Sequence, residues 1–572
     1  MLVCLIFKDL LLERAVGMSE VCVELVGKLV GEMLGLSKEE LSPSDNLISL
    51  GLGSLDIMRI AGLLTKNGCN VTFSELVSNP CMASWVNFAR ERSARSSSNG
   101  SPLLGSANYS KGDPFPITSV QHAYMVGRRD GQELGGTACH AYMEFECGSL
   151  DAAKLERAVE LLILRHPMLR ARFSDDGTAR IEDKVTWKGL TTYRVEGAGN
   201  PDSRIEGIRQ ELSHLRFDIE QDDLIDVRLT VVSPKRTIMH INVDLLAADV
   251  LSIQVLLEDL AHLYDGTDLA PIEIDFMEYA RRTGIGEDAR NEDREYWLNR
   301  IDNMPGGPSL PLKAPMESVK RSQFTRMEYL IDSKSWKNFT EKGRQIGVTQ
   351  SMGIAAVYAK ALSRWSEDKK FLLNLPLFNR KPIHPDVDKI VSDFTSLILL
   401  EADCANAISL LELASQMQGR FQQDVAHSSF GAVEVLRELS HRCPNDPKKA
   451  PVVFASNIGT QFISNKVEDV FGPLSKMLAE TPQVLLDHQI YDHKNGLLLA
   501  WDYVSELLDD KIAKQMFEAY CTAVRFYCEN DWSEPFPDLL PPSQRAARAE
   551  ANSEGADLGG GTLHGRFFAR AH

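Results

Sequence analysis

The sequence predicts a two-part α/β protein, in which a small helical bundle precedes a large unit of alternating helices and strands. Apolar residues recur at helical spacing within the first 95 residues, for example at Val21, Leu25 and Leu29. A polar stretch rich in Ser, Gly and Asn follows this bundle. Beyond that stretch, amphipathic helical segments alternate with short apolar runs, a pattern typical of α/β domains.

Changes in composition divide the 572-residue chain into four segments. We predict the bundle over residues 15–95, a linker over 96–113, the large unit over 114–545 and a further linker over 546–572, which contains three consecutive glycines. Because a domain has about 150 residues on average, the chain is long enough for three or four compact units.

The composition also bears on partners and location. A formal charge of −18 repels nucleic acid and anionic membranes, and 44% hydrophobic with 25% charged residues is ordinary for a globular protein. The apolar residues 1–7 are too short for a secretory signal or a spanning helix, so we expect a cytoplasmic protein without membrane insertion. Met18 is an alternative start. Ten cysteines lack metal-ligand spacing, which predicts reduced thiols and no metal site.

A serine marks the predicted start of a helix in the bundle. The segment DNLISLGLGSLD (residues 45–56) lies between two apolar helical stripes and places Ser54 at the N-cap of the second long helix. A helix N-terminus presents unpaired N–H groups and partial positive charge, which suit a phosphodiester on the serine oxygen. An unmodified capping serine is the alternative interpretation.

The most informative stretch of the large unit is DLLAADVLS (residues 244–252), which closes an apolar strand over 238–243. Carboxylates are too costly to bury without partners, so Asp244 and Asp249, with Ser252, indicate a site rather than a core strand. A solvated turn is the alternative. An arginine is a suitable counter-ion for a buried carboxylate, and we predict that Arg380 pairs with Asp244 or Asp249 unless it is an exposed loop residue.

Several further segments carry polar residues in a fixed order along the large unit. They are FPITSVQHAYMVGR (115–128), RHPMLRARF (165–173), NLPLFNR (374–380), SDFT (392–395), PVVFASNIG (451–459), TPQVLLDH (481–488) and WD (501–502). Together with residues 244–252, they resemble the conserved blocks of heterocyclization domains of nonribosomal peptide synthetases. In those domains Asp-x4-Asp-x2-Ser replaces the His-His-x3-Asp-Gly of ordinary condensation domains. Residues 45–56 resemble an acyl or aryl carrier domain, with Gly53 where many carriers have Asp.

The resemblance implies a fold and a cofactor. We expect a four-helix carrier bundle bearing 4'-phosphopantetheine on Ser54, followed by a V-shaped, two-lobed domain of the chloramphenicol-acetyltransferase type. Its first lobe would span about 114–290 and its second about 291–545, with a tunnel between them. His166 is expected to be a structural hydrogen-bonding residue and not a base.

The resemblance also implies site residues. The expected catalytic residues are Asp487, Ser456 and Gln483; the expected motif positions around them are Asp244, Asp249, Ser252, Arg380, Thr395 and Asn457. Many relatives have Thr where Ala455 stands, and that threonine is thought to assist dehydration. Either Ser456 or an ordered water replaces its hydroxyl here, or its role is minor.

The expected reaction joins a carrier-bound aryl thioester, of a salicyl type, to a carrier-bound cysteine and closes a thiazoline ring with loss of water, as in siderophore synthesis. A partly desolvated carboxyl group must shuttle protons, and Asp487 is the candidate. For Asp244 and Asp249 a structural role is favoured over proton transfer. The alternatives are a domain that only forms the amide and a non-catalytic scaffold that docks carriers.

The resemblance further implies partners. These are an enzyme that activates an aryl acid by adenylation, a phosphopantetheinyl transferase and a downstream cysteinyl carrier domain. The segment LHGRFF (residues 563–568) looks like the approach to an adenylation domain, so we expect the chain to be part of a longer synthetase.

Overall fold

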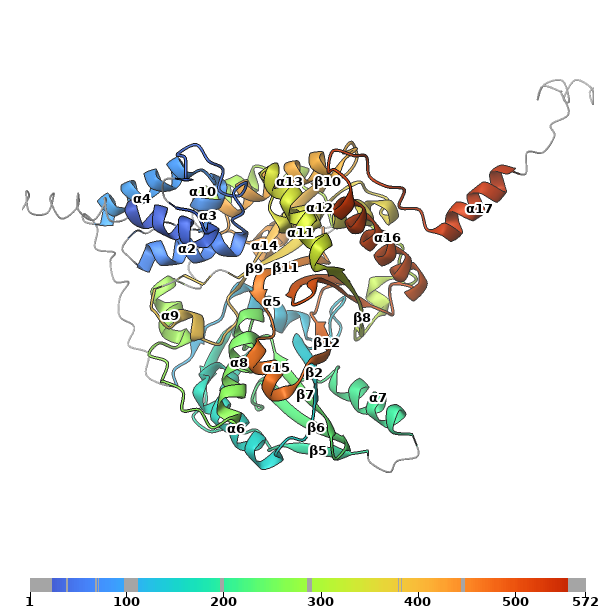
Figure 1. The fold of residues 1–572 in the computed structure, drawn as a ribbon. Helices are drawn as coiled ribbons and strands as arrows, with labels where there is room; N and C mark the ends of the chain where they lie inside the picture. Colours follow the sequence, from blue (N-terminus) through green and yellow to red (C-terminus); the bar gives the residue numbers. More distant parts are fainter. Residues whose placement is uncertain are drawn as a thin grey trace, which may run out of the picture.

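A computed structural model describes residues 23–553, except for 38–39, 67–68, 70, 72, 97–111, 196–199, 285–290, 379, 382 and 444–447. The described part comprises a helical bundle and two lobes (Figure 1). Each lobe is built around one large sheet. The two-lobed α/β architecture and the preceding helical bundle agree with the expectation from the sequence.

The described residues of the N-terminal bundle form four α-helices. A helix over 23–34 is followed by α2 (Ser54–Lys66), α3 (Phe73–Ser78) and α4 (Met82–Ser96). Apolar residues at helical spacing are fully buried between them, including Val26, Ile60 and Leu64. The predicted apolar stripes therefore form the core of this bundle.

The first lobe contains a five-stranded sheet in the order β12-β2-β7-β6-β5. Its own strands are β2 (His140–Cys147), β5 (Thr191–Arg194), β6 (Ile225–Ser233) and β7 (Arg236–Asp244). A small sheet adds β1 (Phe115–Pro116), β3 (Ala171–Ser174) and β4 (Thr178–Ile181). The helices are α5 (Ser119–Gly127), α6 (Ala152–Arg165), α7 (Pro201–Leu212), α8 (Val250–Tyr264) and α9 (Phe276–Thr283).

The second lobe contains a six-stranded sheet in the order β10-β9-β11-β13-β14-β8. The strands are β8 (Phe324–Asp332), β9 (Lys370–Phe378), β10 (Thr395–Asp403), β11 (Val452–Gln461), β13 (Leu486–His493) and β14 (Gly496–Val504). Helices α10 (Asn291–Leu298), α11 (Ser333–Gln345), α12 (Gln350–Trp365), α13 (Leu410–Ala426), α14 (Ala432–Arg442) and α16 (Asp510–Glu529) accompany it, and α17 (Pro542–Ser553) projects away (Figure 1). Helix α15 (Asn465–Phe471), which follows β11, packs instead against α8 and β2 of the first lobe.

One strand crosses between the lobes. β12 (Leu474–Glu480) follows β11 of the second lobe in the chain but pairs antiparallel with β2 of the first lobe, with Met477 opposite Met143. The chain then returns to the second lobe and enters β13, which is parallel to β11. Hydrogen bonds of a single sheet therefore hold the two lobes together.

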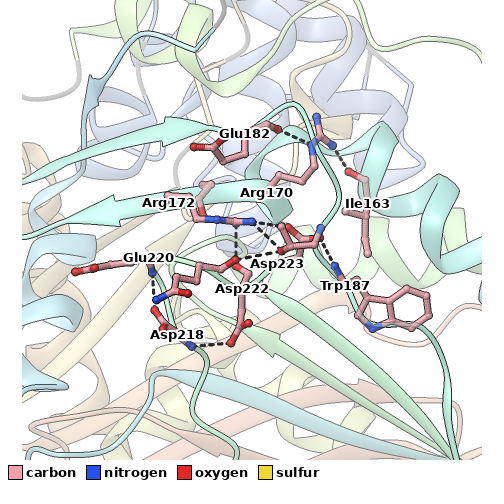
Figure 2. Close-up of polar contacts among 12 residues, drawn as sticks. Ile163, Arg170, Arg172, Glu182, Trp187, Asp218, Glu220, Asp222 and Asp223 are labelled. Atoms are coloured by element: carbon pink, nitrogen blue, oxygen red, sulfur yellow. Dashed lines mark hydrogen bonds and ion pairs between the residues drawn. The ribbon is translucent and has the colours of Figure 1, made fainter.

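The segment RHPMLRARF is structural. Figure 2 shows Arg172 beside Asp223, with Nη2 2.9 Å from Oδ1, and Arg170 donating to backbone carbonyl groups. His166 is buried, and its Nε2 lies 3.0 Å from a carboxylate oxygen of Asp259. These contacts hold the turn between α6 and β3, in agreement with the structural role predicted for His166.

Three further features of the described residues concern membranes, metals and thiols. None of their helices is long and apolar enough to cross a membrane, and no cluster of three or more metal-ligating side chains occurs among them. Free thiols are found at Cys81, Cys139, Cys147, Cys404, Cys443, Cys521 and Cys528. Cys69, however, is disulfide-bonded, so the prediction of reduced thiols is wrong for that residue.

The bundle packs against the second lobe. Helix α3 contacts α13, and the turn before α2 lies on the C-terminal end of α11, where Arg344 Nη1 donates to the carbonyl of Leu50 over 3.4 Å. Asn46 and Ser49 lie next to Gly347, whose φ of 73° is in the left-handed region. The start of α2 therefore faces the second lobe (Figure 1).

We expect Arg344→Glu to weaken this packing, because the substitution removes the donor to Leu50 and places a carboxylate against a carbonyl oxygen. Hydrogen–deuterium exchange should be faster over residues 46–53 and at the end of α11. Arg525→Glu is the matched control, since Arg525 is exposed on α16. Equal exchange in the two variants would show that Arg344 does not hold the bundle.

Candidate active site between the lobes

A cavity of about 550 Å³ lies where the two lobes meet. Its walls come from α5, the loop before α8, the strands β9, β10, β11 and β13, and the segment 481–484 that returns from β12. Of the predicted site residues, Asp249, Thr395, Asn457, Gln483 and Asp487 line it. The sequence therefore identified residues that are far apart in the chain and close in space.

Asp487 is a buried carboxyl group without a charged partner. Its Oδ2 accepts a hydrogen bond of 2.6 Å from Gln489 Nε2, while Oδ1 is buried and has no partner. Asp502 stands opposite Asp487 in the neighbouring strand, but Arg326 binds Asp502. Burial, reinforced by the charge of Asp502, raises the pKa of Asp487 to about 7. Such a group can both accept and donate a proton at neutral pH.

Asp393 is a second carboxyl group of this kind. It lines the cavity just before β10, is 1% exposed, and accepts a 3.0 Å hydrogen bond from the backbone N–H of Thr395 at Oδ1. Its Oδ2 is buried and has no partner. Burial raises the pKa of Asp393 to about 7.

Asp244 and Asp249 are, by contrast, neutralised by arginines. Arg128 Nη2 lies 2.6 Å from Asp244 Oδ2, and Arg380 Nη2 lies 2.9 Å from Asp249 Oδ1. The prediction that Arg380 pairs with one of the two is confirmed for Asp249. Asp244 does not line the cavity, so its ion pair with Arg128 lies behind the residues that form the cavity wall. Both arrangements favour a structural role.

Asp249 and Ser252 also join the lobes. Asp249 is the N-cap of α8 and accepts a 2.7 Å hydrogen bond from the Ser252 backbone N–H. The Ser252 hydroxyl donates to the carbonyl of Ser392 over 2.7 Å and accepts from Arg380 over 2.8 Å. In the Asp-x2-Ser motif, Asp249 thus caps α8, and the hydroxyl of Ser252 binds the segment before β10.

Gln483 lies in the segment that crosses between the lobes. Its φ is 64°, which is unusual for a residue with a side chain, and its backbone N–H donates to the carbonyl of Leu134 over 2.7 Å. A Cβ on Gly127 would lie 2.8 Å from Pro482, so this loop packs directly on the end of α5. The tertiary contacts hold Gln483 in this conformation.

Ser456, which the sequence suggested as a catalytic residue, does not line the cavity, and this position disfavours the alternative in which its hydroxyl replaces the family threonine. Successive residues of a strand point to opposite faces, and Val453, Ala455 and Asn457 of β11 line the cavity. Ser456 points to the other face, where its Oγ lies 2.7 Å from Ser351 Oγ on α12. Only a methyl group stands at position 455.

Ser54 is the first residue of α2, whereas the sequence predicted it as the N-cap, one position earlier in the helix. Gly53 is the N-cap, because its carbonyl accepts the first helical hydrogen bond, from the N–H of Ile57, over 3.1 Å. Asp56 Oδ2 accepts from the Gly53 N–H over 2.9 Å. A second cavity of about 280 Å³, lined by Gly53, Asp56, Gly459 and Asp492 among others, opens beside this helix start. Space for a group attached at this helix start is therefore present.

Sequence reasoning missed five residues that shape the cavity: Tyr124, Arg128, Arg326, Asp393 and Gln489. Tyr124 and Arg128 lie in the FPITSVQHAYMVGR segment, and Asp393 in SDFT, so a search of these blocks for unpaired polar residues could have found them. Arg326 lies outside every block. Arg326 lies on β8 and binds Asp502 on the neighbouring strand, β14. Only the order of the strands in the sheet reveals this contact.

We expect Arg380→Gln to lower the free energy of unfolding by about 3–5 kcal/mol, since it leaves the buried Asp249 carboxylate unpaired. The double variant Arg380→Gln/Asp249→Asn should lose less than the sum of the two single variants. Denaturant unfolding of the parent, both single variants and the double variant measures this coupling. Strictly additive losses would mean that the ion pair does not stabilise the fold.

Asp487→Asn should stabilise the protein at alkaline pH. The folded-state pKa of Asp487 is about 7 and its ordinary value is 3.8. The parent therefore loses about 4 kcal/mol as pH rises between these values, because the unfolded chain releases this proton while the buried carboxyl group of the folded protein retains it. Asparagine does not titrate, so the melting temperature of the variant should exceed that of the parent at pH 8 and approach it near pH 4. If the difference in melting temperature between variant and parent did not depend on pH, the raised pKa of Asp487 would be contradicted.

Comparisons with known proteins agree with this geometry. Residues 115–530 match the family model of the condensation domain, and residues 24–89 match that of the phosphopantetheine attachment site. Phenyloxazoline synthase MbtB of Mycolicibacterium paratuberculosis (strain ATCC BAA-968 / K-10) is 35% identical over 95% of this chain and 47% of its own length. Pyochelin synthetase PchE of Pseudomonas aeruginosa (strain UCBPP-PA14) is 34% identical over 96% of this chain and 38% of its own length. The chain thus spans less than half of each relative.

Solved structures show the same fold. The cyclization-docking bidomain of the nonribosomal peptide synthetase EpoB from Sorangium cellulosum superimposes with a TM-score of 0.68 at 30% identity, covering 74% of this chain and 87% of that one. The nonribosomal peptide synthetase FmoA3 gives a TM-score of 0.70 at 29% identity, covering 82% and 51%. The chain therefore belongs to the condensation-domain family of nonribosomal peptide synthetases, and its N-terminal bundle is a carrier domain for covalently attached 4'-phosphopantetheine.

Proposed function

We propose that this chain condenses an aryl group carried on Ser54 with cysteine held by a downstream carrier domain, and closes the product to a thiazoline with loss of water. The observation that carries the proposal is Asp487, a buried carboxyl group that lines the inter-lobe cavity and has one oxygen without a hydrogen-bond partner. No histidine occurs among the described residues that line this cavity, so an acid group is the available proton carrier.

The position of the carrier supports this proposal. The inter-lobe cavity follows β11 from Val453 to Asn457, and the smaller cavity beside α2 begins at Ile458 and Gly459 of the same strand. Asp487 is paired with Val453. At about 3.3 Å per residue, Gly459 lies roughly 20 Å along the strand from the level of Asp487. When attached, 4'-phosphopantetheine supplies the thiol that holds the acyl group as a thioester.

The opposite end of the cavity suits a second carrier arm. Lys448, Lys449 and Arg437 line the cavity where β11 begins, which is the end farthest from Gly459. Lys449 pairs with Glu133 there, and the further cations at this end of the cavity would attract the phosphodiester that links an arm to its carrier. We therefore place the downstream cysteinyl carrier at this end.

The substrate classes rest on the lining and on the relatives. Apolar side chains, including Ile253, Leu397 and Leu436, line part of the cavity and suit an aromatic ring. The names phenyloxazoline synthase and pyochelin synthetase support an aryl acyl group, a heterocycle and a siderophore product. Partners of such a chain are an adenylation enzyme that activates the aryl acid and a phosphopantetheinyl transferase.

The chemistry follows from the reactants. The cysteinyl amine displaces the thiol of the aryl thioester, which forms an amide, and holding both reactants in one cavity makes this step effectively intramolecular. The cysteine sulfur then adds to the amide carbonyl, and the carbon loses its oxygen as water. Hydroxide is a poor leaving group, so it must be protonated as it departs. Asp487 is placed to deliver this proton, and its pKa near 7 leaves it partly protonated at neutral pH.

Reconstitution tests the proposal. The phosphopantetheinylated protein, loaded with a salicyl group, should convert a cysteinyl carrier into a product about 18 Da lighter than the amide, because one water is lost. Ser54→Ala should accept no loading. Asp487→Asn should still form the amide but make about 100-fold less heterocycle, since general acid–base catalysis contributes at least that factor.

The other outcomes identify the alternatives. Amide without water loss in the parent would indicate a condensation domain that stops at the amide, and no product would indicate a docking scaffold. Seryl and threonyl carriers, assayed beside the cysteinyl carrier, would reveal a preference for oxazoline instead of thiazoline. Asp388→Asn, on an exposed residue, is the matched control for Asp487→Asn.

A further inference from the structure

We propose that Asp393 is a second catalytic residue, which takes the proton from the ring nitrogen during the cyclodehydration while Asp487 protonates the departing oxygen. This inference rests on the proposed function, in which Asp487 is the acid, and adds Asp393 as the base. Loss of water from a hydroxythiazolidine requires both: one proton must reach the oxygen and another must leave the nitrogen. The described part of the cavity offers two buried carboxyl groups without an arginine bound directly to them, Asp393 and Asp487.

The geometry of Asp393 distinguishes it from the neighbouring structural carboxylates. Arg380 donates to Asp249 and to backbone carbonyl groups, and no hydrogen bond joins it to Asp393. Asp393 Oδ1 is held by the Thr395 N–H at 3.0 Å, which fixes the carboxyl group at the start of β10. Oδ2 is left buried without a partner beside the cavity. An unsatisfied buried oxygen is costly, and a hydrogen-bond donor from a substrate would satisfy it.

Tyr124 links the two carboxyl groups electrostatically. It lines the cavity from α5, and burial, together with the charges of Cys139, Asp393 and Asp487, raises the pKa of its phenol. Tyr124 therefore lies within electrostatic range of both carboxyl groups, and all three side chains line the same cavity. The other charged or titratable groups around Asp393 are Asp249 and Arg380, with Cys139 acting from the start of β2.

The surroundings assign the roles of base and acid. Apart from burial, the largest influence on Asp393 is the hydrogen bond from the Thr395 hydroxyl, which with the Thr395 N–H and Arg380 favours the ionised form, while the charge of Asp249 opposes it. For Asp487 the largest is the opposite carboxylate of Asp502, which favours the neutral form, while Gln489 and Arg326 oppose it. Although burial brings both pKa values to about 7, the polar neighbours favour Asp393 as carboxylate and Asp487 as acid.

The step balances. The N–H bond of the hydroxythiazolidine breaks, its proton goes to the Asp393 carboxylate, and its electron pair forms the C=N bond. The C–O bond breaks as the oxygen receives the proton of Asp487, and water leaves. Asp393 ends protonated and Asp487 ends ionised, so one proton returned from Asp393 to Asp487 through solvent in the cavity restores the starting state. No oxidant or reductant is needed.

The test uses the full-length, loaded protein with Asp393→Asn. We expect amide formation within about threefold of the parent and ring closure slowed by about 100-fold or more. The amide rate is an internal control for folding and loading, because both reactions use the same cavity. Asp388→Asn should leave both rates unchanged, and Asp393→Glu, which restores a carboxyl group, should recover part of the ring-closure rate.

The pH profile of ring closure separates a base from a structural residue. A base must be ionised, so the parent rate should rise with pH through a pKa near 7, and the acid should make it fall above that pKa. Asp393→Asn should remove the rising limb and Asp487→Asn the falling limb.

Ring closure by Asp393→Asn at the parent rate would overturn the proposal. So would a slowed ring closure whose pH profile keeps both its rising and its falling limb. Loss of ring closure and amide formation together, with no recovery in Asp393→Glu, would equally reject a role confined to ring closure. If the parent itself forms no heterocycle, the proposed function fails instead, so the two failures are distinguishable.

Discussion

The pairing of β12 with β2 is the contact on which the site depends. β12 belongs to the second lobe by sequence, yet it forms the edge of the sheet in the first lobe. Only residues 481–485 then remain for the return to β13, so this short segment must cross between the lobes. Gln483 takes a positive φ there and is held by Leu134, and Asp487 follows at the start of β13. The position of Asp487 is thus fixed by both lobes at once.

Desolvation then separates carboxyl groups that stabilise the fold from those available for chemistry. Asp244 and Asp249 each have a guanidinium within 3 Å and remain counterbalanced in the interior. Asp393 and Asp487 each have one hydrogen-bonded oxygen and one buried oxygen without a partner. A fold selected only for stability would pair or replace such groups. The two unpaired carboxyl groups are therefore the ones to which the proposed function assigns the chemistry.

The sequence predicted the bundle, the two-part order and five of the residues that line the cavity, because periodicity and local motifs are encoded in neighbouring residues. It also predicted that Arg380 pairs with Asp244 or Asp249, since a buried carboxylate needs an arginine and Arg380 follows an apolar strand. It could not predict the face on which Ser456 lies, because a one-residue difference in a strand reverses the side chain. Nor could it predict Arg326, whose contact with Asp502 depends on the order of strands that are distant in sequence.

The methyl group at position 455 shows which part of the family arrangement this chain can lack. A threonine hydroxyl there could orient the catalytic carboxyl group by donating a hydrogen bond to it. In this chain Gln489, two residues beyond Asp487 and on the same face of β13, donates to Oδ2. Gln489 is itself held by Arg326, whose Nη2 donates to its side-chain oxygen over 3.0 Å. Because one oxygen of Asp487 is already fixed in this way, the other stays free for substrate, and a hydroxyl at position 455 is not needed to orient it.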